Sequence, residues 1–453
     1  MSSTAATAGA QTQVNAFGFA NAFINTEAPV ATLWHTDHTP LTTFAFADVR
    51  VDFNGTASFG SRVAAELDRP ADLVSTTSLR YTLRAWTVGA GVAAAFPEDS
   101  SADNYHYTDD VGNACIEEFE LIVGNNRFDV ADGIYFHMYD EECMPEGKQS
   151  GVETGKYNST LGLIEASRFD QDLIIPIYSD LLMWPGKAIE AVGISKQKIR
   201  MNFTFRPLSR LIRTTGAAAS TAYDLGLTTP ADANAIVANG SSNVLQDAHL
   251  QVHYVWLTQA ERNAIINGRT MTLYREVQKA IEIDVPAAAS QVQTRQSFNN
   301  PCNDIFFAIR LNSKWDIQSA DATQRGYNWF DFSGVDQVLG GTAVAQLPSF
   351  QTHSLNINNT QRYSATPNYL DHHIAKSHYA RKGEKGVHKY PFGRHPCSEH
   401  PTGSLNFSMI DHQDFRWTFN SATQTAGVIL MYMRTWNIAT RADGVLHKEL
   451  QSQ

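Results

Sequence analysis

Apolar and polar side chains alternate with a period of two along much of the chain. The clearest run is KIRMNFTFRP, residues 198–207, in which Ile199, Met201, Phe203 and Phe205 share one face. Successive side chains of a β-strand point to opposite faces, so this run predicts a half-buried strand. Comparable runs occupy residues 44–53, 78–86, 117–124, 249–257, 304–311, 404–411 and 427–438. Eight long strands predict an all-β sandwich architecture.

Turn and helix signals are short. Gly124-Asn125-Asn126 follows one strand directly and supplies residues that tolerate a positive φ, which predicts a tight hairpin. Short helices are predicted at Asp132–Cys143 and at Thr258–Asn267, where Thr258 is a suitable N-cap. We expect these helices to lie in the connections between strands.

Composition changes near the middle of the chain. Residues 208–245 are rich in Ala, Thr, Ser, Gly and Asn, which is typical of a linker or a surface loop. A domain boundary close to residues 210–225 therefore divides the chain into two halves, each large enough for one β-sandwich. We predict an N-terminal arm at 1–25, a first sandwich at 26–212, a linker or surface loop at 213–245 and a second sandwich at 246–453.

The overall charge argues against direct binding to nucleic acid. The chain has 453 residues, 18% of them charged and 11% aromatic, and its net charge is −11. A protein that mainly contacts a phosphate backbone is expected to be basic. The first residues lack a basic, then apolar, leader pattern, and no run of 18 apolar residues occurs, so we expect neither a secreted nor a membrane-spanning protein.

The cysteines and histidines offer candidate metal ligands. The four cysteines are widely spread without a C-x-x-C pair, which favours buried free thiols and a reducing compartment over a disulfide framework. The histidines form short-spaced groups among Pro, Gly, Lys and Arg, and we interpret them as surface-loop or interface residues rather than zinc or iron ligands. These residues are Cys115, Cys143, Cys302 and Cys397, and His35, His38, His372, His373, His378, His388, His395 and His400.

Paired acidic residues and an aromatic run are the other candidates for chemistry. A glycosidase needs two carboxylates facing each other across a sugar. Adjacent acids are more often a solvated face or a helix end, and aromatic residues serve equally as core or interface anchors. The pairs are Asp109-Asp110, Glu117-Glu118 and Glu141-Glu142, and the aromatic run is 327–332. We expect no catalytic residue, no cofactor and no metal.

An ordered series of motifs resembles one known family. In the first half these are Asp110–Leu121, Gly124–Asp129, the short helix Tyr135–Glu142, Leu173–Ile177 with Pro185–Ile189, and Lys198–Pro207. In the second half they are Ala248–Glu261, Asp304–Leu311, Asn328–Phe332 and Glu399–Asp411. The series is similar to the double jelly-roll major capsid proteins of nucleocytoplasmic large DNA viruses, the type found in iridoviruses and chloroviruses. The chain departs from the family pattern at Met409, where the family has a basic residue.

The resemblance carries over a set of structural motif residues. They are Asp110, Gly112, Asn113, Gly124, Asp129, Pro176, Pro185, Gly186, Phe205, Arg206, Trp329, Phe330, Pro401, Gly403, Asn406, Phe407, Ser408 and Asp411. The His/Cys group around Cys397 precedes the last motif, which favours its interpretation as a structural loop.

The resemblance also implies an architecture and partners. It implies two consecutive eight-stranded jelly rolls with short helices in the connections, and a homotrimer that forms a pseudo-hexagonal capsomer of an icosahedral virion, assembled in the host cytoplasm. Its partners would be neighbouring capsomers, minor capsid and penton proteins and an inner viral membrane, without direct contact to nucleic acid. The N-terminal segment before Val30 is either an inner-face contact or a disordered tail.

Two interpretations from other classes explain part of these features. A carbohydrate-binding or carbohydrate-active β-sandwich would account for the strands and aromatic residues, and predicts a monomer or small dimer with affinity for glycans. A bicupin-like metalloenzyme would account for two rolls and the histidines, and predicts stoichiometric metal. Neither explains the ordered motif series.

Overall fold

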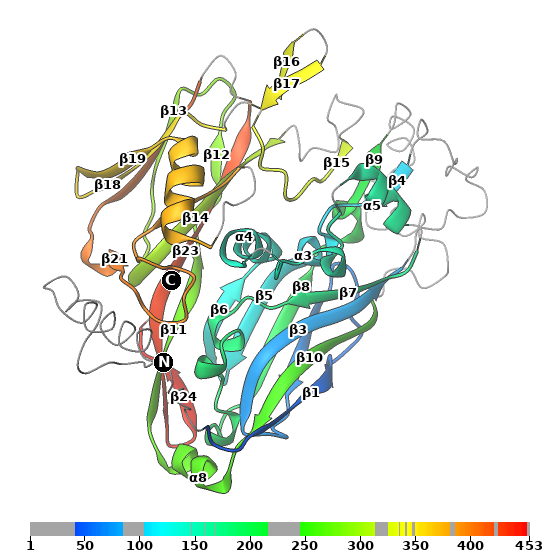
Figure 1. Cartoon of the computed structure of the whole chain (residues 1–453), viewed down its shortest axis with the longest axis vertical. Coiled ribbons are helices and arrows are strands. Elements are labelled where there is room, and N and C mark those ends of the chain that lie inside the picture. The colour runs from blue at the N-terminus through cyan, green and yellow to red at the C-terminus, as the bar shows by residue number, and fades with distance from the viewer. Residues whose placement is uncertain are drawn as a thin grey trace, which may run out of the picture. The chain divides into compact units, whose positions relative to one another are not determined.

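Two eight-stranded jelly rolls make up the fold of the chain (Figure 1). The structure is a computed structural model, and it describes residues 41–84, 104–145, 147–157, 159–167, 169–215, 245–312, 325–334, 336–339, 342–346, 349–380, 386–420 and 425–450. Both rolls lie in one compact unit, Ala45–Gln453. The predicted fold class is confirmed, whereas the predicted arm at 1–25 and most of the predicted linker, 216–244, lie outside the described residues.

The first roll consists of two four-stranded antiparallel sheets. One sheet has the order β1 (Ala45–Asp52), β10 (Gln246–Trp256), β3 (Leu73–Leu83) and β7 (Gln171–Pro176). The other has the order β2 (Arg62–Leu67), β8 (Ile199–Phe205), β5 (Ile116–Val123) and β6 (Asn126–Ala131). The predicted hairpin joins β5 to β6, where Gly124 has a φ of 63°.

The second roll repeats this topology. Its first sheet has the order β11 (Thr270–Lys279), β23 (Gly427–Ala442), β14 (Pro301–Leu311) and β20 (Val387–Pro391). Its second sheet has the order β13 (Gln291–Arg295), β22 (Gln413–Thr418), β18 (Thr352–Ile357) and β19 (Thr360–Ala365). When the eight strands of each roll are numbered 1 to 8 along the chain, the first sheet has the order 1-8-3-6 and the second sheet the order 2-7-4-5 in both rolls. The two rolls therefore share one topology although no sequence repeat joins them.

Further strands extend or cover these sheets. Three short strands pair with the first sheet of the second roll: β12 (Ile283–Val285), β21 (Leu405–Asn406) and β24 (Val445–Lys448). A separate sheet consists of β4 (Asn104–Tyr107), β9 (Ile212–Thr215) and β15 (Arg325–Gly326). A hairpin consists of β16 (Asp336–Leu339) and β17 (Thr342–Gln346).

The predicted boundary at residue 246 is wrong for β10. This strand pairs with β1 from Asp52↔His249 to Ala45↔Trp256, and it also pairs with β3. A jelly roll places its last strand beside its first, so β10 is the last strand of the first roll and not the start of the second. The run predicted at 404–411 is also wrong in most of its length, because only Leu405–Asn406 pairs and a 3-10 turn, η8 (Phe407–Met409), follows.

The helices are short and occupy different environments. The helices α3 (Val111–Cys115), α4 (Gly133–Cys143) and α5 (Thr160–Ala166) lie in the first half, and α8 (Gln259–Asn267) follows β10. A π-helical turn, η7 (Tyr369–Ile374), leads into α9 (Ala375–His378). Thr258 and Glu261 form a capping box at α8, as the predicted cap requires. Among the described residues no helix has the length and apolar character needed to cross a bilayer.

Single 3-10 turns shape the long connections. Besides η8 they are η1 (Val152–Thr154), η2 (Asp180–Leu182), η3 (Pro185–Lys187), η4 (Ala191–Gly193) and η5 (Leu208–Arg210). Three of them, η2, η3 and η4, lie in the connection between β7 and β8.

Each roll has an aromatic core between its two sheets. In the first roll the rings of Phe119 and Phe203 lie 5.2 Å apart. In the second roll Phe307 packs against Trp417 and His353, with ring centroids 6.1 and 4.4 Å apart. These side chains are fully buried. The alternating runs predicted the strands that carry Phe119 and Phe203, whereas β18 and β22 were not predicted, and β14 is buried on both faces.

Candidate functional site: the joint between the two rolls

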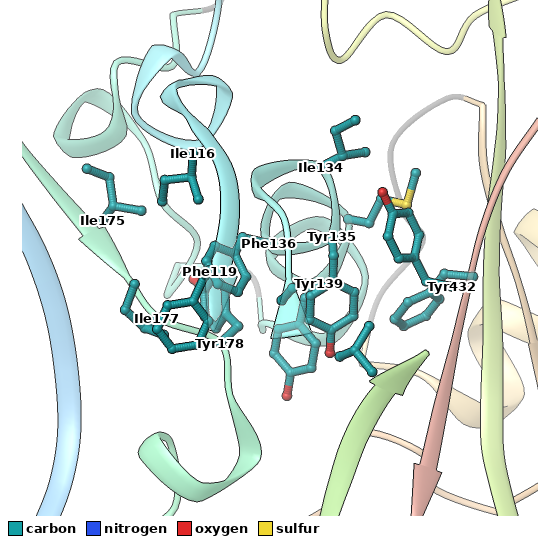
Figure 2. Close-up of a cluster of buried hydrophobic side chains, with 14 of the residues drawn as sticks. Ile116, Phe119, Ile134, Tyr135, Phe136, Tyr139, Ile175, Ile177, Tyr178 and Tyr432 are labelled. Atoms are coloured by element: carbon teal, nitrogen blue, oxygen red, sulfur yellow. The ribbon is translucent and has the colours of Figure 1, made fainter. Parts of the chain in front are cut away.

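The helix α4 lies between the two rolls, and all eleven of its residues are buried. Asp132 caps it, because its side chain accepts a hydrogen bond from the backbone N–H of Tyr135 over 2.8 Å. Figure 2 shows Phe136 on the side of the first roll and Tyr135 directed toward Tyr432 of β23. The rings of Tyr135 and Tyr432 are 5.8 Å apart, and those of Phe136 and Phe119 are 5.9 Å apart. As expected, α4 lies in a connection between strands, from β6 to β7, but it is buried between the rolls and not at the surface.

Buried polar side chains of α4 are paired, which offsets the cost of removing them from water. His137 contacts a carboxylate oxygen of Asp110 over 2.6 Å, and the hydroxyl of Tyr178 donates to Asp140 over 2.5 Å. The remaining two pairs are Glu141 with Lys156, and Glu142 with Lys389 of β20. Of the two interpretations of the acidic pairs, a solvated face or a helix end, the second holds for Asp110, Glu141 and Glu142. All three are buried; Asp110 is the N-cap residue of α3, and the two glutamates lie in the last turn of α4.

The ion pair between Asp180 and Arg275 connects η2 of the first roll to β11 of the second. The carboxylate of Asp180 accepts hydrogen bonds from the Arg275 backbone N–H, Nε and Nη2 at 2.8, 3.0 and 2.6 Å. Lys187 donates to the same carboxylate over 2.5 Å. Burial alone would raise the pKa of Asp180, but the two cations hold it below its usual value. The pair stays ionised inside the protein.

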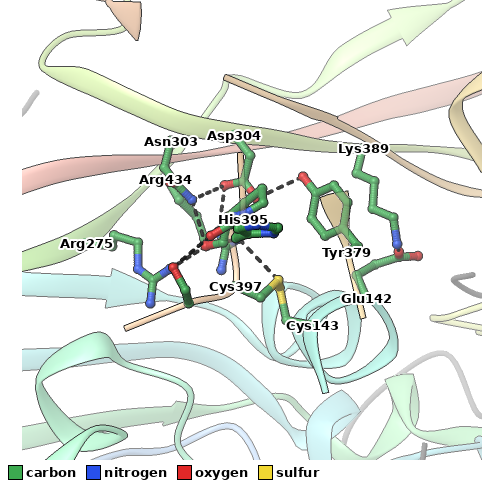
Figure 3. Close-up of a disulfide and its surroundings, with 12 residues drawn as sticks. Glu142, Cys143, Arg275, Asn303, Asp304, Tyr379, Lys389, His395, Cys397 and Arg434 are labelled. Atoms are coloured by element: carbon green, nitrogen blue, oxygen red, sulfur yellow. Dashed lines mark hydrogen bonds and ion pairs between the residues drawn. A yellow bond between two sulfur atoms is a disulfide. The ribbon is translucent and has the colours of Figure 1, made fainter. Parts of the chain in front are cut away.

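A disulfide and a second ion pair lie beside α4 (Figure 3). Cys143, the last residue of α4, is bonded to Cys397, with Cα atoms 5.5 Å apart. Next to them Arg434 of β23 is paired with Asp304 of β14, and its guanidinium lies 5.2 Å from the ring centre of Tyr139. The disulfide therefore covalently links the two rolls.

Five further contacts, made by Asp132, Glu190 and Gln197 of the first roll, extend the joint. Lys279 of β11 and the hydroxyl of Tyr432 both donate to Asp132 over 2.8 Å. At the other end Glu190 accepts from Thr270 over 2.6 Å and is paired with Arg441 of β23. Leu446 of β24 donates its backbone N–H to the Gln197 side chain over 2.8 Å. We call the contact formed by α4, β6, η2 and the segment 185–197 with β11, β20, β23 and β24 the inter-roll joint.

One carboxyl group in the inter-roll joint lacks a close cation. Asp129 of β6 is 1% exposed and accepts the backbone N–H of Val277 of β11 over 3.3 Å. Burial raises the pKa of Asp129 to about 7, and the nearby Glu276 adds to the shift. Near neutral pH this group is therefore divided between its neutral and charged forms.

Several motif residues converge at one end of the joint. Asp110 has a φ of 49° and holds Asn113 through its carboxylate, with oxygen–nitrogen distances of 2.9 and 3.1 Å. Phe330 stacks on His137 with ring centroids 4.0 Å apart. Arg206 lies 3.9 Å from the ring centre of Trp329. These contacts bring residues of both halves of the chain together.

Other motif residues shape the backbone. A Cβ at Gly112 would lie 2.8 Å from the Thr154 carbonyl oxygen, so the close approach of α3 requires glycine there. Asn406 accepts the backbone N–H of Ser408 over 3.0 Å, and Ser408 Oγ accepts that of Asn300 over 2.7 Å. Asp411 is exposed.

The last motif residues lie at strand ends and turns. Phe205 and Pro176 end β8 and β7, Pro185 and Gly186 form η3, Phe407 is buried in η8, and Gly403 and Pro401 belong to the loop before β21.

The interpretation of the cysteines and histidines needs correction. Cys115 and Cys302 are buried free thiols as predicted, but Cys143 and Cys397 are bonded, because the fold brings together residues that are 254 positions apart. His388 is buried on β20 and contacts Asp371 over 2.7 Å, so it is not a surface-loop residue. Within the described ranges no three His, Cys, Asp or Glu residues gather as metal ligands would.

His353 is a further buried histidine that the sequence patterns did not single out. It is 0% exposed inside the second roll, and its Nδ1 lies 3.1 Å from the Tyr363 hydroxyl. Burial lowers the pKa of His353 to about 3, and the neighbouring His388 contributes to the shift. His353 is therefore neutral at neutral pH.

The joint is suited to holding two rolls in one fixed arrangement. Its buried ion pairs are directional, α4 contacts both rolls, and a covalent bond adds to them. The sequence patterns missed Asp180, Arg275, Arg434 and Lys389, because their partners are distant in the chain and no local spacing marks them.

Two family models match the chain in succession. "Major capsid protein N-terminus" matches residues 32–258, and "Large eukaryotic DNA virus major capsid protein" matches residues 261–442. The first match ends just after β10, in agreement with the extent of the first roll.

Known proteins are similar over nearly the whole chain. The major capsid protein of Phaeocystis pouchetii virus is 21% identical over 92% of this chain and 94% of its own length. That of Paramecium bursaria Chlorella virus 1 is 20% identical, over 93% and 91%. Among solved structures, the PBCV-1 virus capsid has a TM-score of 0.72 at 17% identity, covering 93% of this chain and 100% of that one. The Faustovirus major capsid protein has a TM-score of 0.69 at 12% identity, over 93% and 94%.

Proposed function

The chain belongs to the major capsid proteins of large eukaryotic DNA viruses, and from this premise we propose that three copies form a pseudo-hexagonal capsomer that tiles an icosahedral shell. The observation that carries the proposal is the repetition of one strand order, 1-8-3-6 and 2-7-4-5, in two rolls of a single chain. Three such chains in a closed ring would present six similar rolls.

The inter-roll joint supports this proposal. A pseudo-hexagonal ring requires the two rolls of each copy to keep one relative orientation, because an error at each joint would add up around the ring. Buried pairs such as Asp180–Arg275 and the Cys143–Cys397 bond provide that rigidity.

A position in a capsid also suggests how the protein acts and which partners it contacts. We propose that the protein acts without catalysis, that it contacts neighbouring capsomers and minor capsid and penton proteins, and that its inner side faces a viral membrane rather than the genome. The net charge of −11 supports the absence of direct contact with nucleic acid. We further propose assembly in the host cytoplasm.

Sedimentation velocity of the purified chain tests the proposal. We expect one species of three copies whose proportion changes little on dilution, since obligate oligomers bury large apolar interfaces. A monomer that persists at high concentration would contradict the capsomer. A stable dimer with affinity for glycans would instead favour the carbohydrate-binding alternative.

A further inference from the structure

We propose that the η7–α9 segment of one copy packs against the outer face of the sheet β1-β10-β3-β7 of a second copy. This inference rests on the proposed trimer and names the two surfaces that would meet in it. We call the sheet β1-β10-β3-β7 the acceptor sheet, and the helical segment Tyr369–His378 the donor helix. The proposed contact joins the outer face of the acceptor sheet to the exposed side of the donor helix.

The inter-roll joint shows how one roll packs on the next. In the first roll, α4 follows β6, the fifth strand of that roll. It contacts three strands of the second roll's first sheet: β11 through Asp132 and Lys279, β20 through Glu142 and Lys389, and β23 through Tyr135 and Tyr432. A helix after the fifth strand thus lies on the 1-8-3-6 sheet of the following roll.

The second roll has the same parts in the same order. Its fifth strand is β19, and η7 and α9 follow it directly. If the contact is repeated, this helical segment lies on the 1-8-3-6 sheet of a following roll. Each chain has only two rolls, so that sheet belongs to another copy, and its strands are β1, β10, β3 and β7. Repetition of one head-to-tail contact is what closes a ring.

The helix α4, which packs on the following roll of the same chain, is more buried than the donor helix. All of α4 is buried, whereas the donor helix buries Leu370, Ile374 and Ala375 and leaves its other side outward. Its exposed residues are Tyr369, His372, His373, Lys376 and Ser377. On the acceptor sheet, the side chains of Asp48 and Asp52 are 56% and 69% exposed. Both proposed surfaces are therefore accessible in the single copy.

The charges of the two surfaces are complementary. The acceptor sheet carries the exposed carboxylates of Asp48, Asp52, Asp172 and Asp247. Three of these carboxylates have partners within the sheet, because Arg50 pairs with Asp52 and Asp247, and His253 contacts Asp48 over 2.8 Å. Arg80 donates to Gln251 over 3.1 Å, and four carboxylates against two arginines leave the face acidic. The donor helix presents Lys376 and two histidines. Opposite charges across an interface steer encounter and fix the register.

Photo-crosslinking tests the contact without disturbing the core. A benzophenone amino acid in place of Ser377 is expected to attach to peptides of β1, β10, β3 or β7 in the purified oligomer. Mixing isotope-labelled and unlabelled copies shows whether the bond joins two copies. The same probe in place of Ala264, an exposed residue of α8, is the matched control, and we expect no attachment to the acceptor sheet of a second copy. Attachment of the Ser377 probe elsewhere would overturn the inference.

Charge reversal provides a second measurement. Lys376→Glu, and separately Asp48→Lys with Asp172→Lys, should each raise the dissociation constant of the oligomer by about tenfold or more, because like charges at an interface repel. Combining the two sets should recover at least part of the loss. Lys148→Glu, an exposed lysine outside both surfaces and outside the inter-roll joint, is the control and should change nothing.

The outcomes separate the two proposals. A wild-type chain that stays monomeric removes the proposed capsomer and this contact with it. A wild-type trimer that is insensitive to all the charge reversals, and whose Ser377 crosslinks avoid the acceptor sheet, leaves the capsomer intact and refutes only the assigned surfaces.

Discussion

The charge of Asp129 destabilises the folded chain, so removing it should raise stability. This carboxyl is 1% exposed and its pKa is raised from 3.8 to about 7. The neutral form is therefore favoured by folding, and the cost is absent below about pH 4, where both states are protonated, and complete above about pH 7. At about 1.4 kcal/mol per pKa unit, the cost is about 2 kcal/mol near pH 5 and about 4 kcal/mol near pH 8.

The substitution Asp129→Asn keeps the shape of the neutral carboxyl and removes its ionisation. Urea unfolding followed by tryptophan fluorescence at several pH values should show the variant gaining up to about 4 kcal/mol near pH 8 and almost nothing near pH 4. Asp172→Asn changes an exposed carboxylate and serves as the control. A loss of stability near pH 8, or a gain that does not depend on pH, would refute the reasoning.

Three further predictions concern other buried groups. Asp180→Asn leaves Arg275 buried without its anion, so the free energy of unfolding should fall by about 3–5 kcal/mol in denaturant titration; a change under 1 kcal/mol would show that the pair contributes little. Reductant should lower the stability of the wild type by about 2–5 kcal/mol but leave Cys143→Ser unchanged, because the bond to Cys397 restrains the unfolded chain; equal sensitivity would contradict the linkage. Between about pH 7 and pH 5 the wild type should lose about 2 kcal/mol through His353, whose pKa is about 3 when folded and 6.5 when free, and His353→Phe should lose that much less; identical acid profiles would argue against it.

Local patterns predicted long strands such as β8 and β23, because alternating or continuous apolar positions mark them, but they missed the whole sheet β13-β22-β18-β19. The run containing Phe203 became β8, and the Gly124 turn became the β5–β6 hairpin. The capping box at Thr258 was also readable, since its partner lies three residues away. These features depend on neighbours in the sequence.

Features that depend on contacts between residues far apart in the chain could not be predicted from local sequence patterns. β10 belongs to the first roll because it pairs with β1, about 200 residues earlier. The segment 404–411 alternates as a strand would, yet Asn406 caps a 3-10 turn by accepting the backbone N–H of Ser408. Most of the inter-roll joint could not be predicted from local sequence patterns either. Its motif residues Asp110, Arg206 and Trp329 followed from a family resemblance, whereas the disulfide and the Asp180–Arg275 pair depend on packing between rolls.

Electron microscopy of the purified chain tests the central claim most directly, with its mass measured by light scattering on the same fraction. The account predicts a species of about 150 kDa, three times 50.1 kDa, whose class averages show a hexagonal outline with six lobes. A monodisperse 50.1 kDa particle with two lobes would contradict it.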